Sequence, residues 1–381
     1  MDFRKTEEQE LLLESLDEFL DNCGFDDAYF AEKWQKNEPT NEFDKAFLDS
    51  GFGLLGIPEE YGGTHVDLVT MVMVAERLAS RGFPTTCMSN ALQVDDMLTF
   101  GNEEQKKIVF EHLMKTGQSC FSLGLTEPQA GSESANLATT ATHKDGKVII
   151  NGHKCFISNA KEFPYILLMC AEADVEGHPA SMYFVPNDAP GVTMHEMHKI
   201  GLHIGSMCEI YLENVELPES ALVGKMGMGF IQEMKNFEIE RLVMAAGALG
   251  MATCAFEDAA KYANQRVQFG QTIGSFQLIQ ELITESYLKI LNMRNLCYYT
   301  ASKKDNGESI RTESGLAKYY CARAGFEVVD DAMQIMGGIG YTEDCRISRI
   351  WRDIRMNRIG GGTDQIMVHT TSRQILKMYK K

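Results

Sequence analysis

The chain has 381 residues, of which 44% are hydrophobic and 24% are charged, proportions typical of a globular protein with a sizeable core. This length favours two or three domains, or one large composite fold. The formal net charge of -18 argues against nucleic acid as a partner, because neutralising phosphates requires clustered lysine and arginine.

Cysteine usage and the absence of targeting patterns favour the cytoplasm. Ten cysteines are scattered singly from Cys23 to Cys345 without a CxxC pair, and we expect them to be reduced and mostly buried. The first ten residues show no signal-peptide pattern. No apolar run approaches the roughly 20 residues that cross a bilayer. We therefore expect a cytoplasmic protein that does not bind a membrane.

The first region, residues 1–119, has helical patterning. Thr6 precedes an acidic turn, and Gln9 three residues later predicts a capping box. A single apolar stripe follows at helical spacing, formed by Leu12, Leu16, Phe19 and Leu20.

Residues 120–225 predict a compact β-sheet domain or small barrel, because short apolar runs alternate with turn residues. Asn151-Gly152 separates two such runs and predicts a hairpin turn. Further strands are expected at residues 165–170, 182–185 and 209–212.

Residues 226–381 predict helices. All nine prolines lie at or before Pro218, and proline is nearly excluded from helix interiors. Phe256, Ala259 and Ala263 have helical spacing. The order helical, β, helical, without a repeat or a low-complexity linker, predicts an α+β protein whose three parts pack as one compact subunit.

Two glycine-rich or polar segments could carry chemistry. Residues 124–133 form a turn rich in small and hydroxyl residues, which can cradle a phosphate or the polar edge of a ring. Taken alone, this segment is better explained as an ordinary polar turn. Residues 334–341 follow no βαβ strand, so a dinucleotide-binding motif is a poor fit, and a helix ending at Gly337 and Gly338 explains them.

Three successive glycines, Gly360–Gly362, raise the question of what the chain gains by breaking a helical region there. Thr363 can cap a helix that starts near Asp364, and such a helix start behind glycines suits an anion. An exposed corner between helices explains the segment equally well.

Two further groups of polar residues are better explained without a function. Glu240 and Arg241 point about 100° apart on a helix, where a solvated face is the default interpretation. The histidines lack metal-ligand spacing, so no metal is expected.

In this order and spacing, the segments resemble the acyl-CoA dehydrogenase family over the whole chain. Residues 125–132 resemble its first signature, which normally ends in Asp where this chain has Glu133. The runs 254–270 and 346–355 look most like the branch containing crotonobetainyl-CoA reductases and related short-chain enzymes. The C-terminal signature fits at Gln334, Gly337, Gly338, Gly340, Tyr341, Asp344, Arg349 and Asp353.

The resemblance implies an N-terminal helical domain (1–119), a middle β-barrel-like domain (120–225) and a C-terminal four-helix bundle (226–381). It also implies FAD as cofactor, an acyl-CoA or enoyl-CoA substrate in fatty acid metabolism, and an electron-transfer flavoprotein as redox partner. The family's usual assembly is a homotetramer in which one subunit completes its neighbour's FAD site.

Residue by residue, the resemblance places Leu125, Thr126, Gly131 and Ser132 against the flavin ring and pyrophosphate. Phe156 would lie against the isoalloxazine and Ser158 near its N5. A further set would hold the rest of FAD, partly in a neighbouring subunit: Arg266, Phe269, Gln277, Gln334, Gly338, Thr363 and Gln365. Substrate contacts would come from Ser132, Phe237 and Arg241.

The catalytic base is the point at which this chain departs from many relatives. They have Glu at the position of Gly361, and that Glu removes the substrate's α-proton. Long-chain and isovaleryl members instead carry the base on another helix just before an Arg, where this chain has Glu240 and Arg241. We favour this relocation, because a lost base would not require another acid at the alternative position.

Alternative functions remain open on the sequence. A non-catalytic acyl-CoA- or flavin-binding protein would also lack a base at Gly361. An oxidase would pass electrons to oxygen instead of a flavoprotein. Neither the acyl group, for which a short chain or a charged betaine is suggested by the branch, nor the physiological direction follows from the residues.

Overall fold

The computed structural model describes residues 4–380, apart from the side chains of residues 89–95. These residues divide into two compact units. The bundle unit comprises residues 4–31, 64–86 and 238–380, and the sheet unit comprises residues 32–63 and 87–237.

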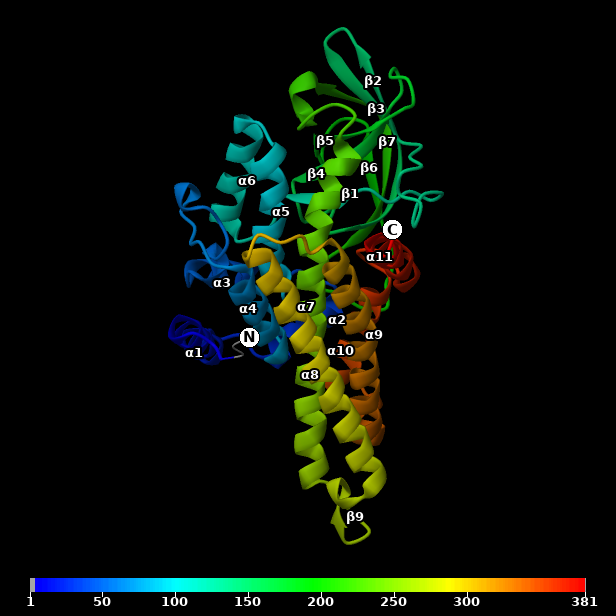
Figure 1. The fold of residues 1–381 in the computed structure, drawn as a ribbon. Helices are drawn as coiled ribbons and strands as arrows, with labels where there is room; N and C mark the ends of the chain where they lie inside the picture. Colours follow the sequence, from blue (N-terminus) through cyan, green and yellow to red (C-terminus); the bar gives the residue numbers. More distant parts are fainter. Residues whose placement is uncertain (1–3, 381) are drawn as a thin grey trace. The chain divides into compact units, whose positions relative to one another are not determined.

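Long helices build the bundle unit, as the proline-free C-terminal region predicts (Figure 1). The helices α2 (Asp27–Lys36) and α7 (Gly229–Gln265) each belong partly to the bundle unit and partly to the sheet unit. The other helices of the bundle unit are α1 (Glu7–Asn22), α4 (Leu68–Ser80), α8 (Gln277–Asp305), α9 (Arg311–Met336), α10 (Arg346–Ile354) and α11 (Asp364–Met378). Short 3-10 turns connect them at η4 (Ile273–Ser275), η5 (Gly337–Tyr341) and η6 (Arg355–Arg358).

The capping box predicted at Thr6 is confirmed. The Thr6 hydroxyl accepts a hydrogen bond from the Gln9 backbone N–H at 3.2 Å, and the Gln9 side-chain oxygen accepts one from the Thr6 backbone N–H at 3.1 Å. The buried face of α1 consists of Leu13, Leu16 and Leu20, so the predicted stripe is displaced by one residue at its start.

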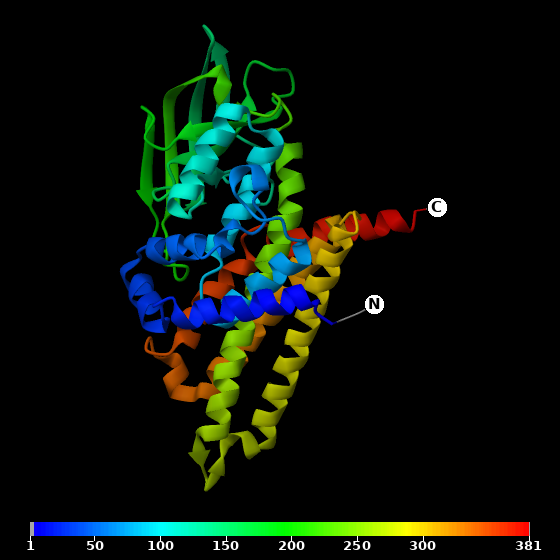
Figure 2. The same ribbon diagram turned by 90° about the vertical axis from the view of Figure 1, so that its left-hand side faces the viewer.

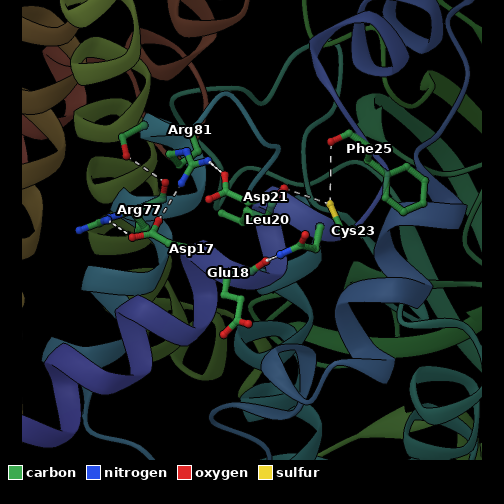
Figure 3. Close-up of polar contacts among 10 residues, drawn as sticks. Asp17, Glu18, Leu20, Asp21, Cys23, Phe25, Arg77 and Arg81 are labelled. Atoms are coloured by element: carbon green, nitrogen blue, oxygen red, sulfur yellow. Dashed lines mark hydrogen bonds and ion pairs between the residues drawn. The ribbon is translucent and has the colours of Figure 1, made fainter.

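Ion pairs fix α1 against α4 within the bundle unit (Figure 3). Arg81 bonds Asp17 at 3.0 Å and also pairs with Asp21, while Arg77 pairs with the same Asp17. Because one carboxylate receives two guanidinium groups, this network restricts how α1 can slide along α4.

The eight strands of the sheet unit form one sheet in the order β6-β7-β3-β2-β4-β5-β8, and β1 pairs in parallel with β4. The strands predicted at residues 165–170, 182–185 and 209–212 are confirmed. The bounds are β1 (Phe121–Gly124), β2 (Thr140–Lys144), β3 (Lys147–Ser158), β4 (Tyr165–Glu172), β5 (Ala180–Pro186), β6 (Val192–Glu196), β7 (Met207–Pro218) and β8 (Leu222–Val223).

The hairpin turn predicted at Asn151-Gly152 is wrong. The turn lies at Asp145-Gly146, where both residues have positive φ and β2 pairs with β3 from Lys144 opposite Lys147. Asp-Gly suits this turn because both residues tolerate the left-handed conformation that a tight hairpin requires. Gly152 instead lies at a register shift in β3, where a Cβ would meet the Thr139 side chain at 2.3 Å.

Both faces of β4 are buried, which explains why its sequence is continuously apolar. Ile166 and Leu168 join the core on one face, whereas Leu167 and Met169 pack with residues of α5 and α6 on the other. The helical segments of this unit are α3 (Asn41–Asp49), α5 (Thr86–Phe100), α6 (Glu103–Thr116), η1 (Phe52–Leu54), η2 (Glu59–Tyr61) and η3 (Glu219–Ala221).

Helix α7 contains a longer apolar run than we expected from the sequence. Among the described helices it alone is long and apolar enough to cross a membrane, with a mean hydropathy of 1.4 over its most apolar window. However, 56% of that window is buried inside the protein, as in a core helix, so the run is weak evidence for a membrane span.

The cysteines are mostly buried, as expected. Of the ten, eight are buried, and Cys23 and Cys345 are half-buried.

Candidate active site

The glycine segment forms a tight turn that starts α11. Gly361 has a φ of 62° and Gly362 a φ of 101°, both in the left-handed region that favours glycine. The Thr363 hydroxyl accepts a hydrogen bond from the Ile366 backbone N–H at 3.2 Å, which confirms the predicted cap. A Cβ added at Gly361 would lie 2.7 Å from the Met244 sulfur. The chain therefore gains a bare turn packed directly against α7.

Two cations hold the carbonyl groups of this turn. The Arg241 Nε atom of α7 donates to the Gly361 oxygen at 3.2 Å. The Lys318 ammonium group of α9 donates to the Gly362 oxygen. Lys318 is 1% exposed, so its stem crosses the interior of the bundle unit to reach the turn.

A buried carboxylate accompanies these cations at the start of α11. Asp364 is 6% exposed, and its Oδ2 atom receives the Arg358 Nε at 2.8 Å. Burial lowers the pKa of Lys318 to about 8, an effect that Arg241 adds to and that Asp364 and Glu240 oppose. The turn thus lies in a charged cluster of two acidic and three basic side chains. They are Glu240, Asp364, Arg241, Lys318 and Arg358.

Glu240 belongs to the same cluster. It lies half-buried on α7, one residue before Arg241. Burial raises the pKa of Glu240 above its ordinary value, while Arg241 and Lys318 oppose the rise by favouring the carboxylate. A carboxylate with a raised pKa is a stronger proton acceptor than an exposed glutamate, and a general base uses that property.

A second group of predicted residues lies in the sheet unit, where β3 meets the loop that follows β1. The Thr126 oxygen accepts the Cys155 N–H at 2.9 Å, and the Leu125 oxygen accepts the Lys154 ammonium at 3.2 Å. These bonds bring the loop and the strand together. Gly131 and Ser132 follow in the exposed part of the loop.

A buried ion pair between Glu127 and Lys154 anchors this loop. The Glu127 carboxylate receives the Lys154 Nζ at 2.6 Å, and also the backbone N–H groups of Ala138 at 2.6 Å and Thr139 at 3.0 Å. Burial alone would raise the pKa of Glu127, but Lys154 and the N–H donors outweigh it and lower the pKa to about 2. Glu127 is therefore an ionised structural anchor for the loop.

Phe156 is held in an unusual conformation next to this loop. It lies at a register shift of β3, has a φ of 58°, and is 57% exposed between two buried residues. Strained backbone of this kind gathers at ligand sites, where the fold compensates its cost. Ser158, at the end of the same strand, is exposed, whereas Phe237 is buried in the apolar core of the sheet unit.

A third group lies on the surface of the bundle unit. Phe269 is 94% exposed with a φ of 51°, at the tip of the hairpin formed by β9 (Val267–Gln268) and β10 (Gln271–Thr272). In both views this hairpin lies at the far end of α7 and α8 from α11 (Figures 1 and 2). A single chain therefore does not bring Phe269 to Thr363. The other exposed members of the predicted set are Arg266, Gln277, Gln334, Gly338 and Gln365.

Sequence reasoning missed three residues of these sites: Lys154, Lys318 and Met244. A lysine inside an otherwise buried strand or helix face was the available signal for the first two, because lysine is almost never buried without a partner. Met244 gave no signal, since a methionine on an apolar helix is ordinary core. Within residues 4–380, no group of His, Cys, Asp or Glu suits a metal ion.

Comparison with protein-family models identifies three consecutive matches. They are described as the N-terminal, middle and C-terminal domains of acyl-CoA dehydrogenase, and they cover residues 6–116, 122–215 and 227–376. The chain is 47% identical over 382 residues to the probable acyl-CoA dehydrogenase YdiO of Escherichia coli strain K12, with 100% of both proteins covered. The chain belongs to the acyl-CoA dehydrogenase family.

Solved structures give the same fold. A chain in the structure of the electron transferring flavoprotein of Acidaminococcus fermentans matches with a TM-score of 0.90 at 32% identity, covering 99% of this chain and 100% of that chain. Butyryl-CoA dehydrogenase from Megasphaera elsdenii matches with a TM-score of 0.90 at 28% identity and the same coverage. This acyl-CoA dehydrogenase therefore has the α+β architecture expected from its sequence, and it is an oxidoreductase acting on CH–CH bonds.

The family implies a flavin cofactor, and the described residues of this acyl-CoA dehydrogenase fit FAD. Phe156 offers an exposed aromatic ring on a strained, fixed backbone, as contact with a flat ring system would require. The start of α11, with its cap at Thr363, offers backbone N–H groups of the kind that bind polar groups at helix N-termini.

Proposed function

We propose that the protein is an FAD-dependent acyl-CoA dehydrogenase of short-chain substrates in which Glu240 moves the substrate's α-proton. Two features that occur together in the bundle unit support this proposal most strongly. Gly361 has no side chain and no space for one, whereas Glu240 provides a partly desolvated carboxyl group in the charged cluster around the same turn.

FAD, when bound, supplies the acceptor for the β-hydride of the substrate. The residues that we expect to hold its flavin end are Leu125, Thr126, Gly131, Ser132, Phe156 and Ser158. Those expected at its adenine end, partly from a neighbouring subunit, are Arg266, Phe269, Gln277, Gln334, Gly338, Thr363 and Gln365.

During oxidation, ionised Glu240 accepts the α-proton of the acyl thioester. The Gly361 backbone N–H donates to the thioester carbonyl, where negative charge grows as the proton leaves. Arg241 supports the CoA side of the site and holds the Gly361 carbonyl, which fixes the peptide on the other side of that residue. Ser132 and Phe237 complete the substrate contacts.

In the reverse direction, protonated Glu240 returns a proton to the α-carbon of an enoyl-CoA such as crotonobetainyl-CoA. Burial raises the pKa of Glu240, which makes its carboxylate a stronger proton acceptor for oxidation and leaves its carboxyl form available as the proton donor for reduction. A short acyl chain is supported by the resemblance to the short-chain branch and by the likeness to butyryl-CoA dehydrogenase.

Assembly and electron transfer complete the proposal. We propose a cytoplasmic homotetramer, supported by large apolar side chains exposed on α8 and α11, and an electron-transfer flavoprotein as partner, supported by the likeness to the Acidaminococcus chain. Exposed apolar residues outside a binding surface are uncommon in such number. They are Leu278, Tyr287, Leu288, Leu291 and Tyr299 on α8, and Val368, Ile375, Leu376 and Met378 on α11.

An anaerobic titration of the purified holoprotein with short saturated acyl-CoAs tests the dehydrogenase activity. Bleaching of the flavin absorbance is the expected result. If none bleaches it, reoxidation of the dithionite-reduced protein by crotonyl-CoA or crotonobetainyl-CoA would indicate a reductase. No response in either direction would favour the non-catalytic protein suggested by Gly361, and rapid peroxide formation under air would favour an oxidase.

Substituting Glu240→Gln tests the base. We expect FAD to be retained and flavin reduction to slow by about a thousandfold, a typical contribution of a positioned general base. Glu238→Gln is the matched control, because it removes an equal charge two residues away on another side of α7. Near-full activity of Glu240→Gln would show that the base is elsewhere.

A further inference from the structure

Lys318 is a buried cation whose role the proposed reaction does not assign. A lysine that is 1% exposed is rare, and it persists only with partners that compensate its desolvation. Its ammonium group donates to the Gly362 oxygen, and its Cε atom lies 3.9 Å from the position a Gly361 Cβ would take. The aliphatic part of the Lys318 side chain therefore packs directly against the glycine turn.

Lys318 and Arg241 act on the turn from two different helices. Arg241, from α7, holds the Gly361 oxygen at 3.2 Å, and Lys318, from α9, holds the oxygen of the next residue. Two successive peptide planes are thereby fixed by charged donors, which are stronger than neutral ones. Arg241 thus holds the peptide between Gly361 and Gly362, and Lys318 holds the one between Gly362 and Thr363.

The charges that face Lys318 come from each of the elements around the turn. Asp364 faces it from α11, and Glu240 and Arg241 face it from α7. Arg358 of η6 neutralises part of the Asp364 charge at 2.8 Å. On Glu240, the two cations that act are Arg241 and Lys318. Removing Lys318 therefore removes one of the two positive charges that favour an ionised Glu240.

We propose that Lys318 is a positioning residue for the proton-transfer step, which fixes the Gly361–Gly362 turn through the Gly362 carbonyl and adds a positive charge to the cluster that contains Glu240. This inference rests on the proposed function of Glu240. Arg241 holds the Gly361 carbonyl, and Lys318 holds the Gly362 carbonyl from another helix.

The test compares Lys318→Met with Lys318→Arg in the FAD-loaded protein. For Lys318→Met we expect the rising limb of the pH profile of flavin reduction to move upward by about one pH unit, because a nearby unit charge is lost in a poorly solvated site. Lys318→Arg, which keeps the charge, should restore the parent midpoint. Lys289→Met is the control, since Lys289 pairs Glu327 at 3.1 Å and Asp331 at 3.6 Å without touching the turn.

A second readout does not depend on turnover. The infrared carboxyl band that disappears in Glu240→Gln can be titrated in ligand-free protein, and its midpoint should move upward in Lys318→Met. If the parent protein reacts with no acyl-CoA in either direction, the proposed function fails, and this band still tests the lysine. An unchanged midpoint together with an unchanged pH profile would overturn the proposal.

Folding failure is also decisive. Should Lys318→Met not fold, Lys318→Gln keeps a hydrogen-bond donor for the Gly362 oxygen without the charge, and the same upward movement is expected. If neither neutral variant folds while Lys318→Arg does, the lysine is needed for the fold alone, and the positioning role is refuted.

Discussion

Substitution of Gly361 by alanine should destabilise the bundle unit for two separable reasons. The first is backbone strain, because a residue with a Cβ at a φ of 62° costs roughly 1–2 kcal/mol relative to glycine. The second is steric, because the new Cβ would lie 2.7 Å from the Met244 sulfur and would displace that side chain. Forcing a side chain from its rotamer costs of order 1 kcal/mol.

The alanine also lowers the entropy of the unfolded chain, which offsets roughly 0.5 kcal/mol. The expected net loss is therefore about 2 kcal/mol in the free energy of unfolding, measured by urea titration at constant FAD. In a Met244→Ala background the steric part disappears, and the same substitution should cost about 1 kcal/mol. Gly247→Ala on α7 is the control, because φ there is not positive and a Cβ would meet only Thr85 Oγ1, at 3.4 Å.

The result has a direct functional consequence. If Gly361 cannot carry a side chain without strain, then Gly361→Glu in a Glu240→Gln background should not restore turnover. Equal stability of Gly361→Ala and the parent protein in both backgrounds would refute the reasoning, as would recovery of activity in the Gly361→Glu double variant.

Two further predictions concern buried charges. Burial raises the pKa of Asp44 from 3.8 to about 7, so stability from this group is complete below pH 4 and is lost as pH rises through about 7, a change of about 4 kcal/mol. Asp44→Asn should therefore unfold at higher urea than the parent at pH 8 but not at pH 4, and equal midpoints at both pH values would contradict this. Glu127→Gln leaves Lys154 as a fully buried, unpaired charge and should cost about 3–5 kcal/mol, whereas a double replacement of Glu127 and Lys154 by methionine should recover most of it. A loss below about 1 kcal/mol for Glu127→Gln in urea unfolding would show that the pair is not ionised.

Local signals predicted much of the fold. The capping residues Thr6 and Thr363 and the glycine that ends α9 follow from hydrogen-bonding rules that act within a few residues. The hairpin was misplaced for a related reason. Asn151-Gly152 and Asp145-Gly146 carry equivalent turn signals, and the choice depends on Thr139 packing against Gly152, a contact that no local pattern contains.

The candidate site was predictable only in part. The position of Glu240 before an Arg could be read from the sequence, but the purpose of the glycines could not. Their environment is made by Met244 and Lys318, which are distant in sequence and meet at the turn only in the folded bundle unit. Likewise, the support that Lys154 gives to the loop after β1 depends on an ion pair between residues 27 positions apart.

The position of an acid on α7 instead of on the turn changes what the rest of the bundle unit must provide. A glutamate on the turn would need the space beside Gly361 that the Met244 side chain occupies. With a bare turn, the carbonyls of residues 361 and 362 are held by Arg241 and Lys318, and the charge of the acid is set by those two cations from the helix side. The glycine turn and the buried lysine are therefore complementary, because each would be destabilising without the other: the turn would lack its donors, and the lysine would lack the oxygen that compensates its burial.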